Sequence, residues 1–223
     1  MDITANNLAN SKTHGFQSSF MPYVSDQRKS KHSEIISFTH DVTAFKDKTH
    51  GPMIKTDNPL HVYLNGDGYF SLQTDRGIRY SRAGVFTTNA EGQLVNLQGD
   101  LVLDEGFGPI TLPEGEANIT ISKDGTLSFQ GGVIARLGYF RFENPFDITQ
   151  EEGTLINTQQ QPLASERASI VQYAHEGSNV NSILQSTRMI RITKTFEEMQ
   201  RLVHQQHELT SHAIESDGRS LTV

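Results

Sequence analysis

The sequence contains no cysteine and no long apolar run. The missing cysteine excludes disulfides, thiolate catalysis and cysteine metal sites, and it suits a reducing cytosol as well as an oxidising space where stray thiols are harmful. No apolar run approaches the roughly 20 residues that span a bilayer, and the amino terminus lacks the basic and apolar regions of a secretory signal. If the chain is exported, we expect it to leave by another route.

Basic residues are also scarce. Lys and Arg number 19 against 26 Asp and Glu, which gives a formal net charge of −7. No basic run is long enough to follow a phosphate backbone, so nucleic acid is not an expected partner.

The carboxyl-terminal part of the chain has the strongest pattern, which predicts one long helix from Ser182 to Ala213. Ser178 or Asn179 is expected to cap its first turn, and no proline or glycine interrupts the run before Gly218. Alternating three- and four-residue steps place five apolar side chains on one narrow stripe: Met189, Ile192, Phe196, Met199 and Val203. The stripe lasts just over two heptads, short of a free-standing coiled coil, so it predicts a partner helix.

The other end of the chain predicts a short helix, within residues 1–20, that His14-Gly15-Phe16 ends. Met1, Ala5 and Leu8 outline its apolar face. A helix of about ten residues is marginal alone, so we expect it to lie against the stripe of the long helix. Because it is short, part of the stripe between Met189 and Val203 is expected to be exposed, mobile or covered by another copy.

The centre of the chain is predicted to be β-rich, since short apolar runs alternate with glycine-containing turns. The candidate strands are 60–64, 69–73, 78–81, 94–97, 101–103, 119–121, 127–129 and 133–142. The turns between them lie at 65–68, 75–77, 89–92, 98–100 and 123–125. Residues 146–170 are polar and predict an irregular return segment.

The fold class is therefore mainly β, with a hairpin-rich β domain inserted between amino- and carboxyl-terminal helices that form a helical stalk. The expected divisions are residues 1–20 for the truncated first helix, 21–57 for an extended linker with a few strand pieces, 58–170 for the β domain and 171–223 for the long helix.

No motif points to a catalytic or cofactor site. The Asn65-Gly66-Asp67-Gly68 turn resembles the start of a calcium loop but lacks the later bidentate acid, and a hairpin turn is favoured. His204 and His207 lie three apart on the long helix without an HExxH pattern, which favours solvated side chains over a zinc or nickel site. There is no Gly-x-Ser-x-Gly elbow, and no pair of acids stands out, so we expect neither an enzyme nor a small-molecule substrate, cofactor or metal.

Four blocks of the sequence, taken in order, carry a shared signature. The first, Ala5-Asn6-Asn7-Leu8-Ala9-Asn10 followed by Gly15-Phe16, resembles the amino-terminal signature of the bacterial flagellar rod and hook proteins. The second runs from Asn58-Pro59-Leu60 through Gly66-Asp67-Gly68-Tyr69-Phe70 and Tyr80-Ser81-Arg82-Ala83-Gly84 to Asn89-Ala90-Glu91-Gly92-Gln93-Leu94-Val95. The third is the stretch 121–128, and the fourth is Glu176-Gly177-Ser178-Asn179-Val180-Asn181 with 187–190 and Phe196-Glu197. In this family Met1 aligns with a position inside the first helix, so that helix is expected to be truncated.

The resemblance implies a structural subunit of the flagellar basal-body rod, exported unfolded through the flagellar export apparatus without a cleaved signal peptide and stacked with other rod subunits across the periplasm. Arg136-Leu137-Gly138 and Gln200-Arg201-Leu202 are more similar to the proximal than to the distal rod type. The implied assembly residues are Asn6, Asn7, Leu8, Asn10, Asn179, Val180 and Asn181, together with the stripe. The alternatives are a distal rod protein, or a secreted β-domain adhesin or carbohydrate-processing protein.

Overall fold

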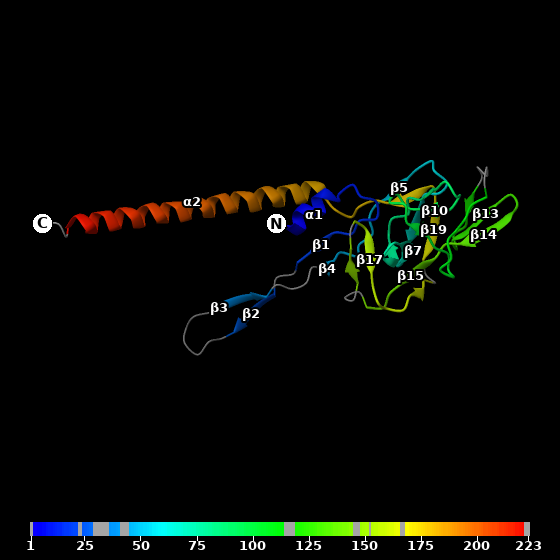
Figure 1. The fold of residues 1–223 in the computed structure, drawn as a ribbon, viewed down its shortest axis with the longest axis horizontal. Helices are drawn as coiled ribbons and strands as arrows, with labels where there is room; N and C mark the ends of the chain where they lie inside the picture. The colour runs from blue at the N-terminus through cyan, green and yellow to red at the C-terminus, as the bar shows by residue number, and fades with distance from the viewer. Residues whose placement is uncertain are drawn as a thin grey trace. The chain divides into compact units, whose positions relative to one another are not determined.

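A computed structural model describes residues 2–21, 24–28, 36–40, 45–113, 119–144, 148–151, 153–165 and 168–220. The chain is mainly β, with a short helix near its amino terminus and a long helix near its carboxyl terminus, as predicted. It divides into two compact units. Met1–Leu8 and Asn181–Val223 form the helical unit, and Ala9–Val180 form the β unit. Figure 1 shows the elements of each.

The largest sheet of the β unit has nine antiparallel strands, in the order β16-β17-β8-β7-β11-β10-β9, with β15 on β7 and β18 on β15. Their bounds are Thr149–Gln150, Leu155–Asn157, Gly77–Ser81, Tyr69–Thr74, Leu101–Val102, Leu94–Val95, Thr87–Thr88, Tyr139–Arg141 and Leu163–Ala164. Strand β7 is central, since Phe70, Ser71 and Leu72 are all buried on it. A strand with both faces covered organises the core around itself.

The remaining strands form small sheets. A three-stranded sheet joins β12 (Thr120–Ile121), β13 (Thr126–Phe129) and β14 (Gly132–Arg136). Four antiparallel pairs complete the unit: β1 (Ser19–Phe20) with β4 (Phe45–Lys46), β2 (Val24–Arg28) with β3 (Ile36–His40), β5 (Met53–Lys55) with β20 (Ala174–Glu176), and β6 (Val62–Asn65) with β19 (Ser169–Gln172).

One apolar cluster joins the nine-stranded sheet, the three-stranded sheet and the β6–β19 pair. The rings of Phe70 and Phe86 meet edge to face with centroids 5.3 Å apart, an arrangement that aromatic quadrupoles favour. Leu127 and Leu137, from the three-stranded sheet and the segment after it, are fully buried in the same cluster. The β unit therefore has a core of its own.

Three expectations for the β unit were wrong. The run 133–142 is two strands, because the chain passes from β14 to β15 at Gly138, where a Cβ would lie 2.4 Å from the Asp104 carbonyl oxygen. The turn 65–68 closes no hairpin, since β6 pairs with β19 and β7 with other strands. The return segment 146–170 is not irregular in its described parts, because it carries β16, β17 and β18.

Helix α2 (Ser182–Ser220) begins where predicted and continues to Ser220, beyond Ala213. At 1.5 Å per residue its 39 residues extend about 58 Å. Neither Ser178 nor Asn179 caps it. Asn181 does, since its Oδ1 accepts the Leu184 N–H at 3.0 Å. Among the described residues, no helix is both long and apolar enough to cross a membrane.

Helix α1 (Asp2–Ala9) ends before His14, as predicted, but it presents a different face. Asn7 is its buried residue, at 2% exposure, whereas Ala5 is exposed and Leu8 half-buried. The prediction took the apolar positions as the covered face. The polar Asn7 is buried instead, and it has interactions within the structure.

Candidate functional site

Two segments of the β unit run beside each other: residues 14–18, which follow α1, and residues 176–179, which lead into α2. Together with residues 46–51 and Arg82 they form what we call the junction. Gly15 N–H donates to the Glu176 carbonyl oxygen at 2.8 Å, and Asn179 N–H donates to that of Phe16 at 3.2 Å. These backbone bonds hold the amino-terminal segment to the segment that leads into α2. The course of one chain end therefore depends on the other.

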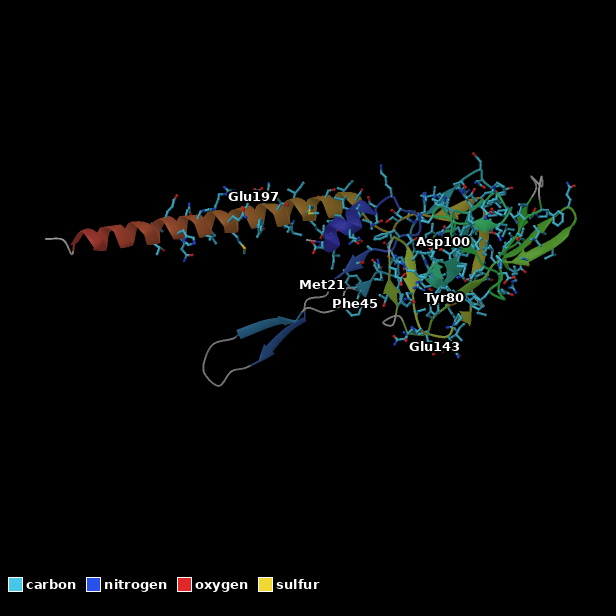
Figure 2. The ribbon with its side chains drawn as sticks, viewed as in Figure 1. Met21, Phe45, Tyr80, Asp100, Glu143 and Glu197 are labelled. Carbon is cyan, nitrogen blue, oxygen red and sulfur yellow. The ribbon has the colours of Figure 1, made fainter. Side chains whose placement is uncertain are left out.

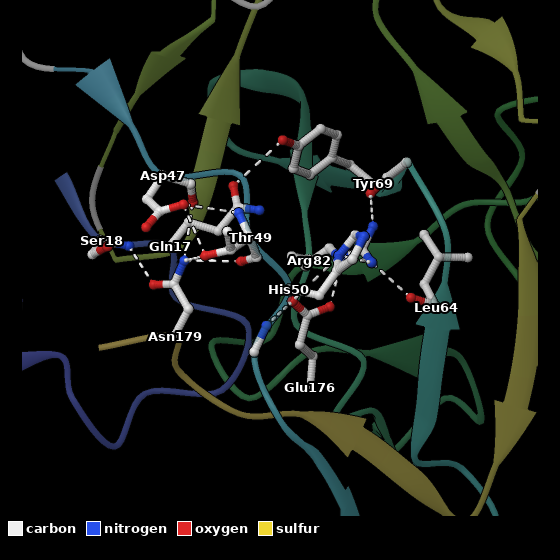
Figure 3. A network of polar contacts seen from close by, with 12 residues as sticks. Gln17, Ser18, Asp47, Thr49, His50, Leu64, Tyr69, Arg82, Glu176 and Asn179 are labelled. Carbon is white, nitrogen blue, oxygen red and sulfur yellow. Dashed lines mark hydrogen bonds and ion pairs between the residues drawn. The ribbon is translucent and has the colours of Figure 1, made fainter. Parts of the chain in front are cut away.

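Asn179 joins three segments through its side-chain amide. Its Oδ1 accepts the Ser18 N–H at 2.7 Å, and its Nδ2 donates to the carbonyl oxygens of Asp47 and Thr49 at 3.0 and 2.9 Å. Figure 3 shows these bonds converging on the amide. Both polar atoms of this amide, the acceptor oxygen and the donor nitrogen, therefore have partners within their own chain.

A buried ion pair lies beside this amide. Arg82 Nε donates to Glu176 Oε2 at 2.5 Å, and both side chains are about 97% removed from solvent, at 3% and 2% exposure. The guanidinium also donates to the carbonyl oxygens of Gly68 at 2.6 Å and Leu64 at 2.7 Å. Glu176 Oε1 accepts the Gly51 N–H at 2.9 Å. The two charges are thus paired and hydrogen-bonded, as burial of charge requires (Figure 3).

Lys46 covers the first segment of the junction. Its Nζ donates to the Gln17 carbonyl oxygen at 2.6 Å and lies 4.6 Å above the centre of the Phe16 ring. Burial lowers the pKa of this ammonium to about 8. A backbone carbonyl and an aromatic face are both favourable surroundings for a cation, so Lys46 fixes Phe16 and Gln17 in place.

Close backbone contact at the junction requires glycine. Gly15 has φ +68°, and a Cβ there would lie 2.4 Å from the Ala83 nitrogen. Gly153 has nearly the same φ, +66°, but a Cβ added there would have nothing within 4 Å. Gly15→Ala is therefore expected to lower the free energy of unfolding by about 1–3 kcal/mol more than Gly153→Ala. Alanine strains the backbone at both positions, but at position 15 its Cβ would also overlap the backbone of Ala83. Urea unfolding of the two variants measures this; equal losses would contradict the close contact.

The apolar stripe of α2 is largely uncovered. Met189 is half-buried, whereas Phe196, Met199 and Val203 are 58%, 61% and 56% exposed and Ile192 is 36% exposed. Figure 2 shows side chains standing out from the helix around Glu197. The expectation that part of the stripe is exposed is confirmed. Exposed apolar patches are commonly interaction surfaces.

The predicted assembly residues fall into two groups. Asn6, Asn7, Leu8, Asn181 and the stripe belong to the helical unit. Asn10, Asn179 and Val180 belong to the β unit, where Asn10 Oδ1 accepts the Thr13 hydroxyl at 3.1 Å. The structure bonds Asn179 to Ser18, Asp47 and Thr49, and in the same junction it pairs Arg82 with Glu176. Arg82 and Glu176 had not been predicted. Both stand in sequence blocks used for the resemblance, but nothing in their spacing pairs them.

No metal centre is formed by the described part of the chain, in which no three His, Asp or Glu side chains are grouped to hold an ion. His204 and His207 are exposed on α2. The turn 65–68 contributes to the junction through the Gly68 carbonyl oxygen rather than through a ligand set.

Comparison with known proteins places these features in a family. Residues 63–129 match the family described as flagellar hook protein FlgE/F/G D1 domain. The flagellar basal-body rod protein FlgF of Caulobacter vibrioides is 34% identical, over 98% of this chain and 92% of its own length. FlgF of Rhizobium meliloti is 30% identical over 99% and 92%, and the rod protein FlgG of Buchnera aphidicola is 28% identical over 88% and 86%.

The β unit is thus of the class found in flagellar hook and rod proteins. The chain belongs to the flagellar basal-body rod protein family. This family is structural and is not an enzyme family, in agreement with the expectation from the sequence. The relatives named FlgF favour the proximal over the distal rod type.

Proposed function

We propose that the protein is a structural subunit of the proximal part of the flagellar rod and that it assembles through the helices at its two ends. The exposed stripe of α2 carries the proposal, because apolar side chains left in water by one chain are stabilised when copies or neighbouring subunits cover them. The partners are other rod subunits of the proximal and distal types. The subunit leaves the cytoplasm through the flagellar export apparatus, without a cleaved signal, and stands in the periplasmic span of the rod.

In this proposal the helical stalk consists of α1, α2 and the segments that lead into them. Asn6, Asn7, Leu8, Asn10, Val180 and Asn181 set the path of the chain ends, and Met189, Ile192, Phe196, Met199 and Val203 contact neighbouring subunits. Asn179 acts within the chain, since both polar atoms of its amide have partners in the junction. The junction holds the stalk segments to the β unit, so that torque passes from one to the other.

A charge placed in the stripe tests the proposal. Phe196→Glu is expected to reduce incorporation into rods at least tenfold, since a carboxylate would be buried without a partner. Thr187→Glu is the matched control. It adds the same charge about 150° around the helix from the stripe at 100° per residue, and it should assemble as the unmodified chain does.

The measurement is made in a strain that lacks its own proximal rod protein and expresses each variant. Purified basal bodies are blotted for the subunit, and swimming is scored. Equal incorporation of Phe196→Glu and the unmodified chain would reject assembly through the stripe. Labelled subunits found solely at the distal end of the rod would favour the distal rod type.

A further inference from the structure

Three histidine rings meet inside the β unit. His14 precedes the junction glycine Gly15, His61 immediately precedes β6, and His175 lies on β20. The ring centroids of His14 and His175 are 4.2 Å apart, and those of His61 and His175 are 5.6 Å apart, both edge to face. We call these three residues the histidine cluster.

Several ring nitrogens of the histidine cluster lack a hydrogen-bond partner in the part of the chain that the structure describes. Both ring nitrogens of His175, and Nδ1 of His14, are buried and have no hydrogen-bond partner among the described residues. His61 Nδ1 lies 3.0 Å from the Thr56 hydroxyl. His175 is 5% exposed. A buried imidazole without a partner tolerates the neutral form far better than the charged one, because nothing replaces the water that would solvate the charge.

The neighbouring rings add to this preference for the neutral form. Burial, followed by the nearby His14 and His61, lowers the pKa of His175 to about 4. Burial, followed by His14, lowers the pKa of His61. At neutral pH His61 and His175 are therefore uncharged. On acidification each proton that enters makes the next less favourable, since the rings are in contact.

The charged groups near the cluster, Glu176 and Lys55, do not stabilise a protonated histidine ring in it. Glu176 follows His175 on β20, but its carboxylate is taken by Arg82 and the Gly51 N–H. Side chains alternate along a strand, so Glu176 and His175 point to opposite sides. Lys55, on the paired strand β5, is exposed and of the same sign as a protonated histidine. His50 contacts Arg82 rather than the cluster.

We propose that the histidine cluster is a pH-sensitive contact that holds the amino-terminal segment on β20 at neutral pH and releases it on acidification. The adjacent backbone bonds, from Gly15 N–H to Glu176 and from Asn179 N–H to Phe16, open when His14 moves away from His175. The sheets around β7 do not depend on these contacts and stay closed. The inference concerns the isolated chain and does not rest on the assignment to the rod.

The sign of the effect follows from proton linkage. The pKa of His175 is lower in the folded chain than in the open or unfolded state, where it is near 6.5. The open state therefore binds more protons between about pH 6.5 and pH 4. The contribution of His175 to the closed state is complete above this window and is lost as the pH falls through it.

Hydrogen–deuterium exchange of the full chain tests the proposal, after correction for the intrinsic pH dependence of exchange. Between pH 7.5 and pH 4.5 the amides of Gly15 and Asn179 are expected to lose protection by about 10- to 100-fold. Those of Leu72 and Tyr80, on β7 and β8, should change much less. The exposed His207→Gln is the control and should behave as the unmodified chain does.

The variant His175→Phe keeps an aromatic ring in contact with His14 but cannot take a proton, so its loss of protection at Gly15 should be at most a few-fold. If that variant does not fold, His175→Leu, which likewise cannot take a proton, serves the same purpose. Three outcomes would overturn the proposal: protection at Gly15 that does not change with pH, an equal loss at Leu72 and Tyr80, or an unaltered pH dependence in the folded His175 variant.

Discussion

Replacing Arg82 with methionine is expected to lower the free energy of unfolding by about 3–5 kcal/mol. The variant leaves the Glu176 carboxylate buried without its counter-charge and removes the donors that satisfy the Gly68 and Leu64 carbonyl oxygens. A loss of this size is a large share of the stability of an ordinary domain. Urea unfolding at pH 7.5, followed by circular dichroism, measures it.

An exposed ion pair provides the control. Arg136 and Glu105 are 3.1 Å apart and nearly half exposed, so Arg136→Met should cost no more than about 1 kcal/mol. Removing both buried charges, in the Arg82→Met and Glu176→Gln double variant, should recover part of the loss because no unpaired charge is left. If Arg82→Met costs no more than Arg136→Met, the buried pair does not stabilise the junction.

The parts of the fold that the sequence predicted well are local. The turns at Asp75-Arg76-Gly77 and Lys123-Asp124-Gly125 close hairpins between neighbouring strands, as expected from their glycines. The start of α2 at Ser182 was also predicted. Such features depend on residues close together in the chain, whose preferences are set by backbone geometry.

The parts that failed depend on distant contacts. The apolar run from Val133 to Phe142 contains Gly138, a residue type that can mark close backbone contact, and the strand breaks there because the carbonyl of Asp104 lies against that residue. Asn179 has the chemistry of a helix cap, yet Asn181 takes that place while Asn179 bonds to Ser18 and Thr49. Turn and cap residues identify a class of position, but tertiary contacts decide which residue occupies it.

The candidate site likewise combines residues that a local sequence pattern predicts with residues that only distant contacts bring together. The stripe of α2 is periodic, so the sequence alone identifies its residues, and the structure shows most of them exposed. Arg82 and Glu176 are separated by 94 residues, and no spacing rule pairs a single arginine with a single acid over that distance. Only the fold brings them together, and because the pair is buried, removing one of its charges strongly lowers the free energy of unfolding.

Ending the chain after Asn181 is expected to abolish incorporation into rods while leaving the β unit folded. The β unit, Ala9–Val180, has its own core and keeps every junction residue, including Glu176 and Asn179. Its midpoint of thermal unfolding should therefore stay within about 2 °C of that of the full chain, a difference of under about 1 kcal/mol. The lost helix carries the whole exposed stripe, so no apolar surface of that kind remains for a neighbouring subunit to cover.

The matched control ends at Ser220, which keeps α2 and should assemble normally. Thermal unfolding by circular dichroism and blots of purified basal bodies report the two properties separately. Rods that contain the chain ending at Asn181 would place assembly in the β unit. A β unit that unfolds without α2 would mean that the two units depend on each other for stability. Loss of assembly with retained stability is the combination expected when the stripe contacts neighbouring subunits and the junction holds the chain ends, because each then depends on different residues.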